Sequence, residues 1–172
     1  ADYEIDQKTY LVDVIATDGS NATDTLSLSV DLLNVDEAPE LQSGTSGTVI
    51  ENLPTSTAIY TASATDEDAG QTATISYSII SNQNDDSGLV SILDSDTGVV
   101  TLDSSADYES QSSYTFEVMA TDSDGLTDTE VVTITVQDEN ESPVLASITP
   151  ASVDENQTNV QIGSVSWTDP DN

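Results

Sequence analysis

The sequence predicts an all-β protein built from β-sandwich domains, and three features support this prediction. Apolar and polar residues alternate with a period of two, as in "YTFEVMA" at 114–120 and "VVTITV" at 131–136. Turn signals such as "EDAG", "NDDSG", "DTG" and "DSDG" separate these runs. No window shows the apolar stripe and the caps of a helix. The alternation indicates strands with one buried and one solvated face, as in a sandwich of two sheets.

The longest unit of the chain contains seven candidate strands. They cover residues 47–51, 58–64, 73–80, 89–93, 98–102, 113–121 and 129–137. In the last two, every second residue is apolar, so these side chains share one face of each strand. We expect that face to form the core, and it consists of Tyr114, Phe116, Val118, Ala120, Val132, Ile134 and Val136.

The chain repeats itself at a spacing of about 104 residues. "ADYE" at 1–4 returns at 106–109, and "YLVDVIATD" at 10–18 matches "YTFEVMATD" at 114–122. "ATDED" at 64–68 matches "WTDPD" at 167–171. A period of this length is a typical domain size. We therefore predict the C-terminal part of one repeat at 1–37, a complete repeat at 38–142 and the N-terminal part of a third at 143–172.

Composition restricts the possible partners. Lys and Arg together number 1 and Asp and Glu 33, which gives a net charge of −32. Nucleic acids and anionic membranes need a basic surface, so both are excluded, whereas cations are favoured. There is no Cys and no His, which excludes disulfides, thiolate metal sites and the commonest general base. No apolar stretch is long enough to insert into a membrane. Solubility in a salty environment is a simpler cause of the acidity and stays open.

The acids gather at strand ends and loops, where successive repeats would meet. At the junction after the complete repeat, the candidate metal ligands are Glu51, Asp107, Glu109, Asp138, Asn140, Glu141, Asp169 and Asp171. Acids one residue apart can point to the same side of an extended segment and share an ion. So many carboxylates would repel one another unless a cation neutralised them. Oxygen ligands without His or Cys point to Ca²⁺, ahead of Mg²⁺ with its stricter geometry.

The same layout occurs at the junction before the complete repeat. Its candidate ligands are Asp2, Glu4, Asn34, Asp36, Glu37, Asp66, Asp68 and Asp122. The alternative is that these are solvated turn residues, since Asp is common in β-turns. Recurrence of the groups in register across repeats favours metal ligation.

Together these motifs resemble the cadherin repeat over essentially the whole chain. Cadherin repeats carry an xEN motif, a DRE-type motif, a DxNDNxP linker, a DxD motif and an AxD motif. Their counterparts here are "IEN" (50–52) and "DEN" (154–156), "DYE" (2–4 and 107–109), "NVDEAP" (34–39) and "DENESP" (138–143), "DED" (66–68) and "DPD" (169–171), and "ATD" (16–18 and 120–122).

The resemblance implies a seven-stranded, Ig-like Greek-key sandwich with several Ca²⁺ ions at each junction. The linker is one residue shorter than DxNDNxP and carries Glu37 or Glu141 where Asp is usual, as in the cadherin-like repeats of large bacterial surface adhesins. Asn34 replaces the first linker Asp, and Thr72 stands where an Asn often follows the DxD motif. Tyr3 and Tyr108, inside the "DYE" motifs, are expected to cover the ion sites.

We therefore predict a calcium-binding tandem repeat of an extracellular, cell-surface adhesin, whose junction ions bind neighbouring repeats together into a stiff stalk. The alternative is a module that binds a polysaccharide or, homophilically, another copy of itself. Exposed Tyr60 or Tyr77 would favour that alternative, whereas Trp167 aligns with Ala64 and is expected in the core. No enzyme is expected, because the acid pairs recur in every repeat and no nucleophile has a partner base.

Overall fold

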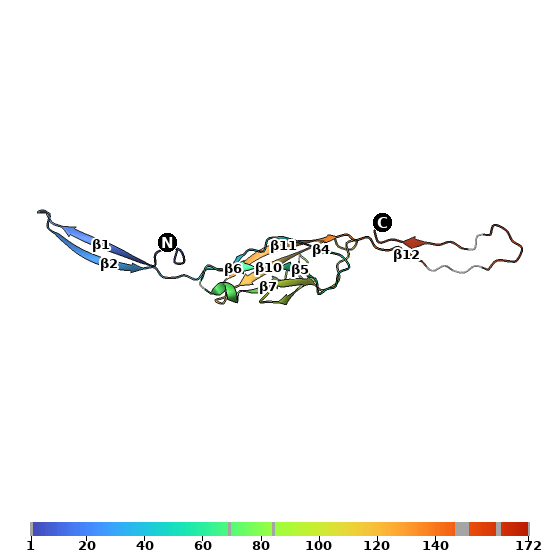
Figure 1. Ribbon diagram of the computed structural model, residues 1–172, viewed down its shortest axis with the longest axis horizontal. Helices are drawn as coiled ribbons and strands as arrows, with labels where there is room; N and C mark the ends of the chain where they lie inside the picture. Colours follow the sequence, from blue (N-terminus) through green and yellow to red (C-terminus); the bar gives the residue numbers. More distant parts are fainter. Residues whose placement is uncertain (1, 69, 84, 147–151, 161–162, 172) are drawn as a thin grey trace.

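The computed structural model describes residues 2–68, 70–83, 85–146, 152–160 and 163–171. Figure 1 shows an elongated chain, with a sandwich in the middle, a two-stranded hairpin on one side and an extended segment on the other. Strands account for nearly all the regular structure of the described residues. The all-β fold class is confirmed. Residues 147–151, 161–162 and 172 of the predicted third repeat lie outside the described residues.

The first sheet of the central sandwich has four strands. In spatial order they are β4 (Ser46–Ile50), β11 (Thr127–Gln137), β10 (Ser113–Thr121) and β7 (Ser76–Ile80). β10 pairs antiparallel with both β11 and β7, whereas β4 runs parallel to β11. The register places Phe116 opposite Val132, so two apolar side chains meet on the inner face.

The second sheet has three strands, with a short two-stranded ladder beside it. The sheet consists of β5 (Ala58–Thr61), β9 (Val99–Leu102) and β8 (Val90–Asp94), and the ladder of β3 (Glu40–Leu41) and β6 (Ala64–Thr65). All of these pairings are antiparallel. The inner faces of the two sheets enclose one core.

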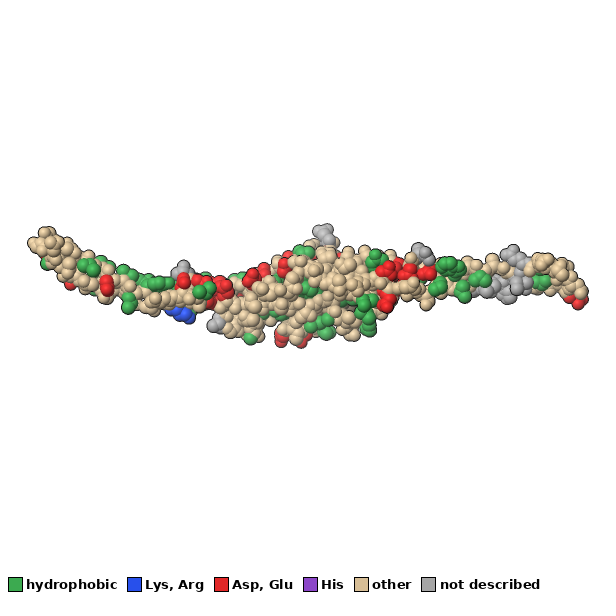
Figure 2. Space-filling model, turned by 45° about the horizontal axis from the view of Figure 1, so that its top comes forward, with side chains coloured by type: hydrophobic (Ala, Val, Ile, Leu, Met, Phe, Trp, Pro, Cys, Tyr) green, Lys and Arg blue, Asp and Glu red, His purple; other side chains and the backbone are tan. Residues whose placement is uncertain are grey.

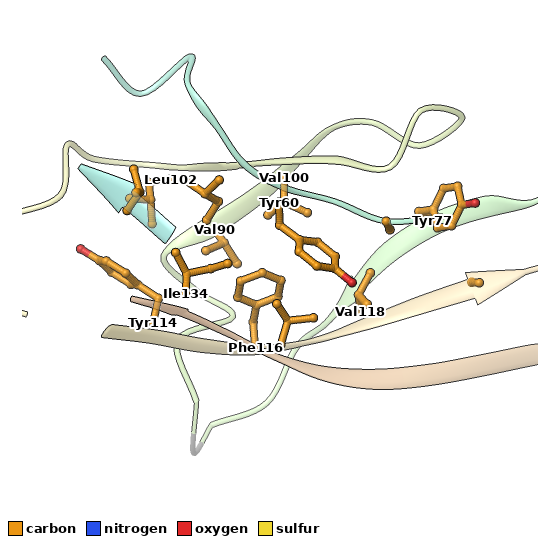
Figure 3. Close-up of a cluster of buried hydrophobic side chains, with 14 of the residues drawn as sticks. Tyr60, Tyr77, Val90, Val100, Leu102, Tyr114, Phe116, Val118 and Ile134 are labelled. Atoms are coloured by element: carbon orange, nitrogen blue, oxygen red, sulfur yellow. The ribbon is translucent and has the colours of Figure 1, made fainter. Parts of the chain in front are cut away.

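The core is the one that the alternation predicts. Phe116, Val132 and Ile134 are fully buried (0% exposed) on the inner face of the four-stranded sheet. Tyr60 comes from the opposite sheet and meets Phe116 edge to face, with ring centroids 6.2 Å apart and planes at 79°. Figure 3 shows both rings in the middle of the cluster, with Val100 above them.

Two predicted strands differ markedly in extent, whereas the ends of the other five agree within two residues. The strand expected at 58–64 breaks into β5 and β6, so that the chain changes from one sheet to a separate ladder. The strand expected at 73–80 begins only at Ser76, because a 3₁₀ turn, η1 (Gln71–Thr74), occupies its start. Gly70 precedes η1 with φ of 94°, a conformation that favours glycine. Both changes place "DED" on a compact bend at the end of the sandwich.

The terminal segments have no second sheet among the described residues. β1 (Thr9–Thr17) and β2 (Thr23–Asp31) form an antiparallel hairpin that repeats the β10–β11 hairpin. Its Leu11 is 77% exposed. At the other end, β12 (Val144–Leu145) pairs with β13 (Trp167–Thr168), and Trp167 is 57% exposed. The expectation that Trp167 packs in a core is not met here, since none of the described strands forms a sheet opposite it.

Candidate metal centre

Carboxylates gather at both ends of the central sandwich, where it meets the terminal segments. Figure 2 shows Asp and Glu side chains concentrated at these two places. The group between the N-terminal segment and the sandwich is called the first junction here, and the group between the sandwich and the C-terminal segment the second junction. The residues of the first junction are Asp2, Glu4, Asn34, Asp36, Glu37, Asp66, Asp68, Asp122 and Asp124. Those of the second junction are Glu51, Asp107, Glu109, Asp138, Asn140, Glu141, Asp169 and Asp171.

Asp68 is the structural centre of the first junction. It lies on the bend after β6 and is buried, with 6% of its surface exposed. Its Oδ1 accepts a hydrogen bond from Nδ2 of Asn34 at 2.6 Å, and its Oδ2 accepts one from the backbone N–H of Glu37 at 2.9 Å. Oδ1 of Asp66 in turn accepts the N–H of Asp68 at 2.9 Å. The bend thereby holds the linker between β2 and β3 in place.

Three carboxylates of the first junction converge on one point. Oxygens of Glu4, Glu37 and Asp68 lie within 4.8 Å of one another, although these residues come from three separate segments. Oε2 of Glu37 is shielded from solvent and has no hydrogen-bond partner. Buried carboxylate oxygens are normally satisfied, so this arrangement fits the ligand shell of a hard cation.

Asp66 and Asp122 extend the same pattern. Asp122 follows β10 and is 6% exposed. Its Oδ1 accepts the backbone N–H groups of Asp124, Gly125 and Leu126 at 2.9, 2.6 and 2.9 Å, which shapes the loop between β10 and β11. The second oxygen, Oδ2, is buried without a partner, as is Oδ2 of Asp66. Asp122 therefore has one structural oxygen and one that is available to an ion.

Two polar residues of the first junction were missed by sequence reasoning. Asp124 accepts a hydrogen bond at Oδ2 from Nε2 of Gln71, at 3.1 Å, and the same nitrogen donates to Oδ1 of Asp36. Asp124 could have been found from the sequence, since Asp122 and Asp124 in "TDSDG" have the spacing of the DxD motif. Gln71 has no such signal, because a glutamine on a turn is ordinary.

Glu51 has the same central position at the second junction. It follows β4 and is 1% exposed. Its Oε2 accepts the N–H of Tyr108 and its Oε1 the N–H of Glu139, both at 2.7 Å. These two bonds fix the "DYE" segment and the outgoing linker to the end of the sandwich.

Two groups of three carboxylates meet at the second junction. Oxygens of Glu51, Glu109 and Glu141 lie within 4.8 Å of one another, and so do oxygens of Glu109, Asp138 and Asp171. Glu109 belongs to both groups. Oε2 of Glu141 is buried without a hydrogen-bond partner. The geometry could thus hold more than one cation side by side.

The two junctions share a hydrogen-bond pattern one repeat apart. Oδ2 of Asp171 accepts the N–H of Glu141 at 2.9 Å, as Oδ2 of Asp68 accepts the N–H of Glu37. Oδ1 of Asp169 accepts the N–H of Asp171 at 3.3 Å, as Asp66 does for Asp68. Each linker glutamate is therefore held by its backbone, and Oε2 of its side chain has no hydrogen-bond partner.

Some predicted ligands are not in the groups of three. The oxygens of Asp107 accept the N–H and the hydroxyl of Ser110, at 3.0 and 2.9 Å. Nδ2 of Asn140 donates to the carbonyl of Glu141 at 2.8 Å. Oδ1 of Asp2 accepts backbone N–H groups of its own turn, from Glu4 at 3.0 Å and Ile5 at 3.2 Å.

The two linker glutamates have raised pKa values, chiefly because burial removes them from water and secondly because other carboxylates lie close to them. Desolvation, helped by the charge of Asp68, raises the pKa of Glu37 above its ordinary value. Desolvation raises the pKa of Glu141 as well, and the charges of Glu51 and Asp171 add to it. A divalent cation would reverse this effect, because it favours the charged carboxylate.

The two tyrosines that would support carbohydrate binding are not exposed. Tyr60 and Tyr77 are buried, at 7% and 9% exposure, so the feature that would favour a carbohydrate site is absent from these positions. Tyr108 lines a hollow with Glu109, Asp138 and Asp171, beside the carboxylates as the sequence suggested. The ring of Tyr3 instead lies 4.1 Å from Nζ of Lys8.

None of the described helices has the length and hydrophobicity needed to cross a membrane.

Comparison with known proteins identifies the class. The model of the cadherin domain matches residues 45–137. The human "Cadherin EGF LAG seven-pass G-type receptor 2" is 35% identical over 146 residues, which is 82% of this chain but only 5% of that relative. The chain belongs to the cadherin family, and its repeating unit is an adhesion module, not an enzyme.

Solved structures agree with this assignment. Extracellular cadherin domains 1–4 of protocadherin gamma B7 superpose with a TM-score of 0.64 at 25% identity, covering 99% of this chain and 42% of that one. A cis-dimer structure of domains 3–6 of protocadherin gamma B7 gives a TM-score of 0.63 at 26% identity, covering 98% and 45%. The matches therefore span more than one domain of those proteins.

Proposed function

We propose that this chain is a calcium-binding segment of an extracellular, cell-surface adhesin, with Ca²⁺ ions at the two junctions between successive cadherin repeats. Residues 1–37, 38–142 and 143–172 are parts of three such repeats. The ions would link neighbouring repeats and stiffen the chain into a stalk.

The observation that carries this proposal is the recurrence of one unsatisfied oxygen. Oε2 of Glu37 and Oε2 of Glu141 are both buried and lack a hydrogen-bond partner. The two residues occupy equivalent linker positions, and each lies in a group of converging carboxylates. Solvated turn acids would not repeat such an arrangement, because leaving a carboxylate oxygen buried and unpaired costs free energy.

The chemistry of the donors selects the ion. In these groups all the converging atoms are carboxylate oxygens, and each group of three draws on three separate segments of the chain. Ca²⁺ accepts six to eight oxygens in flexible geometry and supplies the positive charge that such a group needs, while Mg²⁺ requires a stricter octahedron. The chain's own residues provide the ligands from both sides of each linker. Without a cation their mutual repulsion would loosen the linker.

Thermal unfolding of the 172-residue chain tests the proposal. Extracellular modules bind Ca²⁺ at about 10⁻⁴ to 10⁻³ M, so about 5 mM Ca²⁺ stabilises the folded state by about 1 to 2.3 kcal/mol for each site. We expect the melting temperature to rise in Ca²⁺ relative to EDTA, with a much smaller change in equal Mg²⁺. Equal melting in EDTA and Ca²⁺ would show that the acids are solvated turn residues.

Homophilic binding is a second candidate, supported by one neighbour. The related domains 3–6 of protocadherin gamma B7 were solved as a cis dimer. Sedimentation of the chain in Ca²⁺ and in EDTA tests this candidate, which predicts a Ca²⁺-dependent dimer. A polysaccharide partner remains a sequence prediction, and the burial of Tyr60 and Tyr77 removes two of its aromatic candidates.

A further inference from the structure

One glutamine connects the incoming linker to the sandwich at the first junction. Gln71 begins η1, and its Nε2 donates to Oδ1 of Asp36 and, at 3.1 Å, to Oδ2 of Asp124. Its Oε1 accepts the hydroxyl of Ser123 at 2.8 Å. Both polar atoms of the amide are therefore used. Asp36 belongs to the linker, whereas Ser123 and Asp124 belong to the loop between β10 and β11.

An amide suits this place because the chain is almost free of positive charge. Lys and Arg together number 1, and that residue, Lys8, lies over the ring of Tyr3. The amide N–H groups can hold two carboxylates near each other without a charge that would repel a cation. The second junction has a similar contact, in which Nδ2 of Asn52 donates to Oε1 of Glu141.

The loop that Gln71 binds also carries an oxygen suited to an ion. Asp122 is 6% exposed, and its Oδ2 is buried without a hydrogen-bond partner. Gln71 therefore fixes Asp36 against the loop in which this unsatisfied oxygen lies. Removing the amide would free Asp36 to move with the linker and would leave Asp124 without this donor.

We propose that Gln71 is a positioning residue of the first junction, which holds Asp36 against the Asp122 loop so that a divalent cation meets its ligands already in place. This inference rests on the proposed calcium function. Groups that orient metal ligands from outside the ligand shell typically change metal affinity about 10- to 100-fold when they are removed.

A calcium titration followed by ¹H–¹⁵N NMR tests the proposal within one molecule. The backbone amide of Gly125, bonded to Asp122, reports on the first junction, and that of Glu139, bonded to Glu51, reports on the second. The variant is Gln71→Met, which keeps the side-chain length and removes the hydrogen bonds. The matched control is Gln111→Met, which removes two Nε2 bonds of 2.9 Å outside the carboxylate groups.

We expect Gln71→Met to raise the Ca²⁺ midpoint at Gly125 by about tenfold or more and to leave the midpoint at Glu139 unchanged. Gln111→Met should change neither midpoint. A second variant, Ser123→Ala, removes only the bond to Oε1 and should shift Gly125 in the same direction by less. This exposed substitution also keeps the test valid if Gln71→Met folds poorly.

The outcomes separate this inference from the function on which it rests. An unchanged midpoint at Gly125 in both variants, or an equal rise at Gly125 and Glu139, would overturn the role of Gln71 while calcium binding stands. A wild-type chain in which neither amide responds to Ca²⁺ would overturn the proposed function itself.

Discussion

Asp122 offers the sharpest separation of a structural role from an ionic one, because its two oxygens differ. Oδ1 accepts three backbone N–H groups, at 2.6 to 2.9 Å, and Oδ2 is buried with no partner. Asp122→Ala removes both oxygens. Asp122→Asn keeps an acceptor at Oδ1 and replaces the other oxygen by an amide nitrogen, which cannot bind a cation.

In EDTA, Asp122→Ala should be strongly destabilising. A hydrogen bond to a charged group contributes about 1.5 to 3 kcal/mol, and three donors on one oxygen do not add fully, so we expect a loss of about 2 to 4 kcal/mol. For a repeat of this size, each kcal/mol lowers the melting temperature by about 4 to 8 °C. Asp122→Asn retains the acceptor and removes the charge that repels Asp36. The free energy of unfolding of this variant should therefore fall by less than about 1 kcal/mol.

In Ca²⁺ the two variants should resemble each other in one respect. Both variants should lose much of the Ca²⁺-dependent rise in melting temperature, because both lack the oxygen at Oδ2. Thermal unfolding of the three proteins in EDTA and in Ca²⁺ gives all the values needed. The reasoning fails if Asp122→Asn keeps the full calcium rise, or if it melts as low as Asp122→Ala in EDTA.

Three further predictions concern pH and packing. The pKa values of Glu37 and Glu141 are raised in the folded state, so protonation of these groups stabilises the fold. This stabilisation is fully present below the ordinary glutamate pKa of about 4.3 and is lost as the pH rises through the raised pKa values. The ion-free chain should therefore melt higher near pH 5 than at pH 7, and the Ca²⁺-loaded chain should show the opposite trend, since protons displace the ion; a flat profile in EDTA contradicts this. Phe116→Ala, at 0% exposure, should cost about 3 to 5 kcal/mol in urea unfolding, and a loss under 1 kcal/mol would be inconsistent with the core described. Gly98→Ala should lower the free energy of unfolding by more than an ordinary loop substitution does, because the φ of Gly98 is +65° and a Cβ there would lie 2.6 Å from the carbonyl oxygen of Ala62. Unchanged urea unfolding of this variant would argue against the turn described.

The sequence predicts the strands of the central sandwich well where alternation is strict. The strand at 113–121 has the predicted bounds, and its Phe116 is fully buried as expected. The predictions for 58–64 and 73–80 were too long. Both errors come from local backbone geometry, since the break between β5 and β6 and the turn after Gly70 depend on how the bend packs, not on residue alternation.

The repeat spacing also predicts which acids meet. The structure brings Glu4, Glu37 and Asp68 together at one junction, and Glu51, Glu109 and Glu141 at the other, from segments that are far apart in the chain. The equivalence of positions 37 and 141 is readable from the sequence. The sequence does not reveal that the Oε2 atoms of these two residues are buried and unpaired, because burial depends on what the neighbouring segment covers.

The sequence by itself determines the all-β class, the repeat period, the core face and the concentration of acids at strand ends, because these follow from alternation, composition and spacing. Only the tertiary structure decides which oxygen of each acid is occupied. It shows that Asp107 binds Ser110, that Asp122 uses Oδ1 to shape a loop while its Oδ2 is buried without a hydrogen-bond partner, and that Gln71 bridges Asp36 and Asp124. The reason is physical: a hydrogen bond depends on distance and direction between residues that the chain brings together only when it folds.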